Sequence, residues 1–173
     1  MSDWKLVFQQ GLPNGNVLKG FVDADWGSNV NDCKSTSGFT FLLAGGTISW
    51  GSKKQSAIAL SSMEAEYITT AHAAKEVVWL RQLLLKLKQR IEKPTILCMD
   101  NQSAITITCN PEFHNHSKHI EIRHHFLRQK LDEEELDLEF VPTGDQVADV
   151  LMKGLVQEKH DRFAEAMGVH HVG

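Results

Sequence analysis

Cysteine is scarce in this sequence. The 173 residues include only three, Cys33, Cys98 and Cys109, which are widely spaced and form no C-x-x-C pair. An odd, scattered set of this kind excludes a disulfide framework and matches no zinc knuckle. We therefore expect three free thiols and no structural zinc held by cysteine.

Long apolar runs are also missing. No window approaches the roughly 18 consecutive apolar residues that a membrane-spanning helix needs, so we expect no membrane partner. The first residues, Met1 to Trp4, lack the basic and then apolar pattern of a secretory leader. Together with the scarcity of cysteine, this predicts a reducing, intracellular setting.

Positive charge is not in excess. The 18 Lys and Arg residues are outnumbered by 22 Asp and Glu residues, which gives a net charge of -4. Non-specific affinity for nucleic acid comes mostly from neutralised phosphates, so a general basic binding surface is excluded. Any contact with a polyanion must be local or supplied by a partner. An acidic balance also fits carboxylates gathered around divalent cations, although many soluble enzymes share it.

The sequence does contain enough apolar residues to form one hydrophobic core. Hydrophobic residues make up 42% of the chain, and no internal repeat or low-complexity linker divides it. We expect a single domain over residues 1–173. Residues 21–26, 38–43 and 47–51 read as strands, with a hairpin turn at Gly45 and Gly46, which predicts an antiparallel meander.

The pattern changes to a helical period from residue 61 to about residue 88. Its apolar residues are spaced by four, three, four and three, at Ala73, Val77, Leu80, Leu84 and Leu87. Ser61 and Glu64 stand in the S-x-x-E spacing of a capping box at the start of this helix. This is the most strongly patterned helix of the chain.

Strands and helices alternate in the second half. Residues 95–100 read as a buried strand, followed by a helix from about residue 103, a helix over 120–131 and a strand over 136–141. A last helix is predicted from about 146 to 155, with Thr143 and Gln146 in capping-box spacing. The order of elements predicts an α/β fold in which helices flank a mixed sheet.

Glu66 is the most informative acid. At 100° per residue it falls on the apolar stripe of the long helix, whereas Glu64 projects from the opposite face. A carboxylate on the core side is costly unless a partner such as a bound cation compensates it. The alternative is a first-turn acid that the helix dipole favours and that water still reaches.

Two strands also carry acids that need a reason. Asp100 ends an apolar strand and begins the turn into a helix, where open α/β sheets place ligand-binding groups, although a plain turn acid is the alternative. Asp23 lies inside a strand, where aspartate is disfavoured. Strand alternation puts Asp23 and Asp25 on one face, so parity does not choose between them.

The last predicted helix offers Asp145 and Asp149. Asp145 is explained as a first-turn acid, and Asp149 lies away from the apolar face, where a solvated acid is the competing interpretation. Acids from a strand, a helix, a second strand and a last helix converge only if the sheet brings them together. Two divalent ions roughly 4 Å apart would neutralise such a cluster and activate water at a phosphodiester. Oxygen ligands favour magnesium or manganese over zinc.

Several ordered sequence blocks resemble one known family between residues 19 and 155. The chain is similar to the ribonuclease H domain of Ty1/copia-type retrotransposon polyproteins. The matching blocks are GFVDADW (20–26), STSGF (35–39), ISWGSKKQ (48–55), ALSSMEAEY (59–67), DNQSAI (100–105), KHI (118–120) and AD (148–149). On this resemblance the core covers 19–155, and 156–173 is a C-terminal extension, with a helix expected over 161–167.

The resemblance implies a ribonuclease H-like fold with a five-stranded mixed sheet and catalysis by two Mg²⁺ or Mn²⁺ ions. The implied catalytic and metal-binding residues are Asp23, Glu66, Asp100 and Asp149. The implied substrate-binding residues are Ser62, Asn101 and Gln102, which would contact the minor groove of a hybrid. Neutral hydrogen-bonding groups suit that task because they can reach ribose 2′-hydroxyls without reading sequence.

The resemblance also implies a function and partners. We expect an endoribonuclease that hydrolyses the RNA strand of RNA–DNA hybrids during reverse transcription, inside cytoplasmic virus-like particles. The expected partners are the hybrid and the reverse transcriptase domain of the same polyprotein, and the isolated domain is expected to be a monomer. The alternatives are an inactive or weakly active hybrid-binding domain and a DNA-joining transposase or integrase of the same fold. The glutamate of the first helix and the AD block favour the ribonuclease.

One departure from the pattern concerns the loop before Asp149. Cellular enzymes of this fold usually carry a histidine there, whereas residues 141–146 contain none.

The remaining histidines, basic residues and tryptophans are given structural or surface roles first. The histidines at 114, 116, 119, 124 and 125 match no zinc signature and are interpreted as part of a polar loop and helix face, with phosphate contact as the alternative. Lys53, Lys54, Lys118, Arg123 and Arg128 form either a local phosphate track or solvated surface. Trp26 and Trp50 are expected in the core.

Overall fold

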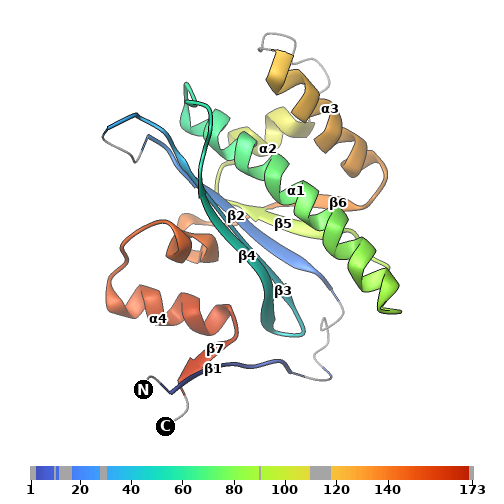
Figure 1. Ribbon diagram of the computed structural model, residues 1–173, viewed down its shortest axis with the longest axis vertical. Helices are drawn as coiled ribbons and strands as arrows, with labels where there is room; N and C mark the ends of the chain where they lie inside the picture. The colour runs from blue at the N-terminus through green and yellow to red at the C-terminus, as the bar shows by residue number, and fades with distance from the viewer. Residues whose placement is uncertain are drawn as a thin grey trace.

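A five-stranded mixed sheet lies at the centre of the computed structural model (Figure 1). The structure describes residues 3–9, 11, 17–27, 31–89, 91–109 and 118–171, with the backbone alone for 118–121. The strand order is β4-β3-β2-β5-β6. The strands are β2 (Lys19–Asp25), β3 (Thr36–Leu43), β4 (Gly46–Lys54), β5 (Thr95–Met99) and β6 (Leu136–Phe140).

The predicted antiparallel meander and the predicted mixed sheet are both confirmed. β2, β3 and β4 pair antiparallel, whereas β5 pairs parallel with β2 and β6 pairs parallel with β5. The turn between β3 and β4 comes one residue earlier than expected. Ala44 and Gly45 take the left-handed conformation, with φ of 52° and 77°, and Gly46 already belongs to β4.

Three helices cover one face of the sheet: α1 (Ser62–Lys86), α2 (Gln102–Cys109) and α3 (Lys118–Asp132) (Figure 1). The predicted stripe of α1 is buried from Ala73 to Leu84, where it packs with Val22 and Leu97 of the sheet. Leu87 is exposed, because the helix ends one residue before it. Ser61 caps the helix as predicted, accepting a hydrogen bond from Glu64 N at 3.1 Å.

The predicted last helix is wrong. The segment forms two short 3-10 turns, η1 (Thr143–Asp145) and η2 (Val147–Leu151). Gln146 separates them because its extended backbone, with ψ of 95°, does not continue a helix. The predicted capping box is also absent: the Gln146 side chain caps η2 by accepting from Ala148 N, whereas the cap of η1, Pro142, makes no side-chain cap bond.

The C-terminal extension lies on the side of the sheet opposite to α1, α2 and α3 (Figure 1). Its helix, α4 (Gln157–Ala166), is longer than expected and starts earlier. The strand after it, β7 (Val169–His171), pairs antiparallel with β1 (Trp4–Leu6), so the two ends of the chain lie side by side (Figure 1). Thr47 of β4 donates a hydrogen bond to Met167 O at 2.9 Å. The extension is therefore tied to the central sheet.

Two tryptophans expected in the core lie at the surface. Trp26 is 52% exposed and Trp50 is 64% exposed. Trp50 is on β4, an edge strand of the sheet. Trp26 follows the end of β2, and its indole donates a hydrogen bond to Ala59 O at 3.0 Å. The three cysteines are free thiols, as predicted. Within the described ranges, every helix is too short or too polar to cross a lipid bilayer.

Candidate metal centre

The parallel pairing of β2 with β5 brings two of the predicted acids together. Phe21 pairs with Cys98 in this register. Asp23 and Asp100 lie two residues further along each strand, so both reach the same end of the pair. Asp23 is inside β2 and is 2% exposed, and Asp100 follows the last residue of β5. The end of this parallel pair is where α/β sheets bind ligands.

Glu66 reaches the same point from the first turns of α1. It is 5% exposed, as its helical phase predicted. A buried polar cluster holds this end of the helix against the sheet. Gln55, directly after β4, donates through Nε2 to Ala65 O and to Ser37 Oγ, both at 2.9 Å. Thr69 joins the cluster, with its Oγ1 2.6 Å from Ser37 Oγ.

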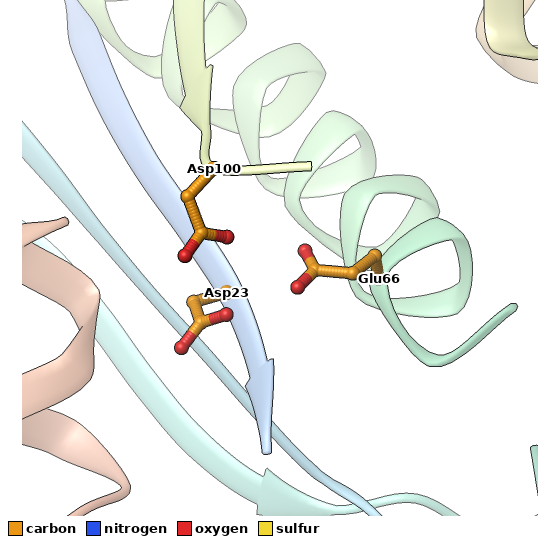
Figure 2. A group of neighbouring side chains, drawn as sticks. All are labelled: Asp23, Glu66 and Asp100. Atoms are coloured by element: carbon orange, nitrogen blue, oxygen red, sulfur yellow. The ribbon is translucent and has the colours of Figure 1, made fainter. Parts of the chain in front are cut away.

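The three acids form one group. Figure 2 shows the carboxyl groups of Asp23, Glu66 and Asp100 turned toward one another from β2, α1 and the end of β5. One oxygen from each lies within 4.8 Å of the others. Glu66 Oε2 is buried and has no hydrogen-bond partner. An unpartnered buried oxygen is costly unless a ligand completes it, and an all-oxygen donor set fits Mg²⁺ or Mn²⁺.

Burial and mutual repulsion disfavour charge on this group. Burial raises the pKa of Glu66 to about 10, with the neighbouring charges of Asp23 and Asp100 adding to the effect. Burial, followed by a hydrogen bond with Asp149, raises the pKa of Asp23 to about 6, against the opposing effect of Lys153. Such shifts are typical of carboxylates that are arranged for a cation or for chemistry.

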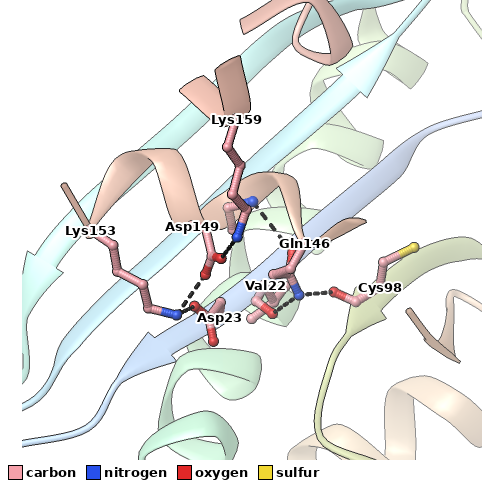
Figure 3. Close-up of polar contacts among 8 residues, drawn as sticks. Val22, Asp23, Cys98, Gln146, Asp149, Lys153 and Lys159 are labelled. Carbon is pink, nitrogen blue, oxygen red and sulfur yellow. Dashed lines mark hydrogen bonds and ion pairs between the residues drawn. The ribbon is translucent and has the colours of Figure 1, made fainter. Parts of the chain in front are cut away.

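Asp149 lies beside this group and outside it. It is 2% exposed on η2, so the alternative of a solvated helix acid is wrong. Burial acts to raise the pKa of Asp149, but hydrogen bonds with Asp23, Lys153 and Lys159 outweigh it and hold the pKa below its usual range. Figure 3 shows Lys153 between the carboxylates of Asp23 and Asp149. The structure thus brings three predicted acids together and joins the fourth to them through a lysine.

Gln146 fixes the height of η2 over the sheet. It is fully buried and donates through Nε2 to Val22 O at 2.9 Å and to Cys98 O at 3.4 Å (Figure 3). Those carbonyls belong to β2 and β5, the strands that position Asp23 and Asp100. Sequence reasoning assigned Gln146 only a capping role. Its bonds to both strands join residues far apart in the sequence, so no local pattern announces them.

The three predicted substrate-binding residues lie at the starts of α1 and α2. Ser62 is the first residue of α1 and Gln102 the first residue of α2, and both are exposed. Asn101 follows Asp100 and caps α2, since its Oδ1 accepts a hydrogen bond from Ala104 N at 3.0 Å. Asn101 directly follows Asp100, Gln102 comes two residues after it, and Ser62 stands four residues before Glu66 on the same helix.

The histidine-rich segment is only partly described. His114 and His116 lie outside the described residues, as does the His119 side chain. His124 Nε2 lies 3.2 Å from Ile107 O, and its ring stacks on Tyr67 at 6.3 Å between centroids. Among the side chains that are described, no group suited to a metal contains histidine or cysteine. Of the basic residues, Lys54 pairs with Asp32 at 2.7 Å.

Sequence reasoning also missed two lysines at the site. Lys153 contacts Asp23 at 2.8 Å and Asp149 at 2.6 Å, and Lys159 contacts Asp149 at 2.9 Å. The i,i+4 spacing of Asp149 and Lys153 was an available signal. On the helix that was predicted there, it would have indicated only a surface ion pair.

The chain is similar to parts of retrotransposon polyproteins. It is 38% identical over 154 residues to the retrovirus-related Pol polyprotein from transposon TNT 1-94 of Nicotiana tabacum, a match that covers 89% of this chain and 12% of that polyprotein. It is 39% identical over 163 residues to the corresponding polyprotein from transposon RE1 of Arabidopsis thaliana, covering 93% of this chain and 11% of the relative. The chain thus spans about a tenth of these relatives.

Solved structures share the fold at low sequence identity. LC11-RNase H1, isolated from compost by a metagenomic approach, superposes with a TM-score of 0.60 at 15% identity, covering 85% of this chain and 97% of that one. The same enzyme in complex with an RNA/DNA hybrid gives a TM-score of 0.57 at 14% identity, covering 78% and 93%. The protease-reverse transcriptase of prototype foamy virus gives 0.51 at 13% identity, covering 92% of this chain and 21% of the viral protein.

No family model matches the chain, so its assignment depends on these relatives and on the fold. Both relatives are Pol polyproteins of plant retrotransposons. The five-stranded mixed sheet has the ribonuclease H topology of the solved neighbours. The chain is therefore a homologue of one segment of the Pol polyproteins of copia-type retrotransposons, and it has the ribonuclease H-like fold.

Proposed function

We propose that this chain is a metal-dependent endoribonuclease that hydrolyses the RNA strand of RNA–DNA hybrids. The observation that carries the proposal is the group of Asp23, Glu66 and Asp100, whose ligand atoms lie within 4.8 Å of one another. A buried Glu66 oxygen without a partner adds to it. A cluster of this kind repels itself, so its burial implies a cationic ligand.

Asp23, Glu66 and Asp100 would hold one Mg²⁺ or Mn²⁺ ion, and Asp23 and Asp149 a second. Bound there, the ions would lower the pKa of an attacking water and stabilise the leaving oxygen of a phosphodiester. The protein's own part is to hold the carboxylates in place: Gln146 ties η2 to both strands, and Gln55 ties the start of α1 to the sheet. Such fixed ligands need little rearrangement during the reaction.

The substrate would approach the surface formed by the starts of α1 and α2. Ser62 and Gln102 are exposed there. Asn101 uses its carbonyl oxygen as a cap, which leaves its amide group free to donate. Neutral donors and acceptors of this kind can bond ribose 2′-hydroxyls in the minor groove of a hybrid. The solved complex of LC11-RNase H1 with an RNA/DNA hybrid supports a hybrid as the ligand class.

The setting of the activity is part of the same proposal. Because the relatives are much longer Pol polyproteins, the domain would act during reverse transcription, inside cytoplasmic virus-like particles. A reverse transcriptase domain in the same polyprotein would hold the hybrid and raise its effective concentration. We expect the isolated chain to be a monomer and to cut more weakly than the tethered one.

A substrate panel tests the activity. The full chain would be incubated with Mg²⁺, Mn²⁺ or a chelator and with labelled RNA as hybrid, RNA duplex and single strand, and with DNA duplex. Cutting of hybrid RNA alone, abolished by the chelator and by Glu66→Gln, is the expected result. Glu139→Gln, an exposed acid of β6 outside the acidic group, is the matched control and should cut like the wild type.

The same panel separates the competing functions. Binding of hybrid without any cutting, in both metals, would identify a binding domain instead. Strand transfer between DNA molecules would identify a DNA-joining enzyme. Cutting of hybrid that persists in the chelator would overturn the assignment of the acidic group as the reacting centre.

A further inference from the structure

Lys153 occupies the space between two acids of the proposed site. Its Nζ lies 2.8 Å from Asp23 Oδ2 and 2.6 Å from Asp149 Oδ1, close to ideal lengths for charge-assisted hydrogen bonds (Figure 3). Both aspartate side chains are almost fully buried, whereas about a third of the lysine side chain is exposed. The chain thus supplies its own cation to the Asp23 and Asp149 half of the site.

The backbone around Lys153 is fixed to the sheet. Lys153 N donates to Asp149 O at 2.9 Å, and Met152 N donates to the same oxygen at 3.1 Å. Met152 lies directly over Gly38, the β3 residue that pairs with Asp23. A Cβ at Gly38 would come within 2.7 Å of Met152 Sδ. The absent side chain of Gly38 therefore allows the lysine-bearing segment to lie close to Asp23.

The two halves of the site differ in whether the protein supplies a cation to their carboxylates. Asp149 has a second cation, Lys159 of α4, at 2.9 Å from its Oδ2. Glu66 and Asp100 have no lysine or arginine partner among the described ion pairs, and Glu66 Oε2 has no partner at all. One half is therefore neutralised by the protein, and the other half lacks a cation.

We propose that Lys153 is the resident counter-cation of the Asp23 and Asp149 half, and that a divalent ion enters this half only by displacing its ammonium group. The inference deepens the proposed function and depends on it. Lys153 Nζ already occupies Asp23 Oδ2 and Asp149 Oδ1, and its positive charge would repel a divalent ion at the same two oxygens. The ions therefore bind in order: first beside Glu66 and Asp100, and at higher concentration between Asp23 and Asp149.

Displacement is feasible because only the end of the side chain must move. Lys153 has a flexible four-carbon stem and is partly open to solvent, so its ammonium group can leave while the backbone stays bonded to Asp149 O. The displaced ammonium group would then be free to contact a substrate phosphate near the acids. Lys153 is thus a positioning residue of the metal-free site, and its conformation depends on metal.

Calorimetric titration of the full chain with Mn²⁺ tests the order of binding. The wild type should show one tighter and one weaker site, and Lys153→Met should tighten the weaker one by about tenfold, which corresponds to about 1.4 kcal/mol. Lys159→Met is the matched control, since it removes the same charge from Asp149 without bridging to Asp23. It should change the weaker site by no more than about threefold, the size of a partly exposed ion pair.

A second measurement uses the unmodified protein and does not depend on a variant that folds. Acetylation of Lys153 by a small reagent, followed by mass spectrometry, should be slow in a chelator and several-fold faster in excess Mn²⁺. Lys130 of α3, which pairs with Glu133 and Glu135 after the end of the helix, is the internal control and should react at the same rate in both conditions.

The outcomes separate the inference from the proposed function. Equal tightening by Lys153→Met and Lys159→Met, or a Lys153 acetylation rate that ignores Mn²⁺, would overturn the inference and leave the metal centre of Glu66 and Asp100 intact. A wild-type chain that binds no Mn²⁺ at any site would overturn both. Faster Lys153 acetylation in Mn²⁺ together with a tighter site that survives Glu66→Gln unchanged would contradict the proposed role of Glu66 and the order of binding, and would leave the displacement of Lys153 intact.

Discussion

Gln146 donates a hydrogen bond to Val22 O at 2.9 Å, although 124 residues separate the two in the sequence. Val22 precedes Asp23, and Gln146 stands three residues before Asp149. A single buried amide therefore sets the distance between the strand that carries one acid and the turn that carries another. Neutral hydrogen bonds therefore hold the backbone around the site in place, and cations balance the charges of its carboxylates.

The first prediction concerns this amide. Gln146→Met keeps the length of the side chain but leaves Val22 O and Ala148 N without their partner. The free energy of unfolding should fall by roughly 1–3 kcal/mol, the usual cost of buried polar groups left unpaired. Denaturant unfolding measures it, and Gln129→Met, an exposed residue of α3, is the control. A loss no larger than that of the control would contradict the proposed role of Gln146.

The second prediction concerns pH in the absence of metal. Burial and the charge of Asp23 raise the pKa of Glu66 from 4.5 to about 10 in the folded protein. The folded chain therefore keeps a proton that the unfolded chain releases above pH 4.5. This contribution to stability is complete below pH 4.5 and is lost as the pH rises toward about 10. The pKa of Asp23, raised from 3.8 to about 6, adds a smaller loss of the same sign between those two pH values.

Thermal unfolding in a chelator checks this sign. The midpoint temperature of the wild type should fall between about pH 5 and pH 9, and Glu66→Gln should flatten that fall because glutamine does not titrate. Parallel curves for the two proteins would show that Glu66 is already ionised in the folded state. Added Mn²⁺ should stabilise the wild type more at the higher pH, since a cation replaces the proton.

The third prediction concerns the close contact of Gly38 with Met152. Gly38→Ala places a Cβ within 2.7 Å of Met152 Sδ, so the methionine and the segment behind it must shift. The variant should lose roughly 1–3 kcal/mol of unfolding free energy, as overpacked cores do. Combining it with Met152→Ala removes the clash, and the double variant should be more stable than the sum of the two single changes predicts. Additive losses would show that the two residues do not interact.

Local periodicity predicted the elements that depend on local contacts. The phase of α1 identified Glu66 as core-facing, and the burial of Ala73, Val77 and Leu80 beside it agrees. Strand parity left Asp23 and Asp25 equivalent, and the resemblance to a family favoured Asp23. The structure separates them: Asp23 is buried beside Asp100, whereas Asp25, at the end of β2, is half-buried and outside the acidic group. That difference comes from β5 and η2, which are distant in sequence.

The failures have the same physical origin. The last helix was predicted from apolar spacing after Gln146, but the Gln146 side chain bonds to β2 and β5 and its backbone turns extended. Lys153 was overlooked because its contact with Asp23 spans 130 residues. The exposed Trp50 was misplaced because composition does not reveal that β4 is an edge strand.

Cleavage of the same labelled hybrid by Asp23→Asn and Asp25→Asn tests the central claim most directly. The two residues share a strand and a face, and only Asp23 contributes to the acidic group. In Mg²⁺ or Mn²⁺, Asp23→Asn should cut at least on the order of 100-fold more slowly. Removing a residue that only orients a metal ligand costs roughly 10–100-fold in activity, and removing the ligand itself should cost more. Asp25→Asn should cut like the wild type. Equal loss in both variants, or full activity in Asp23→Asn, would contradict the account.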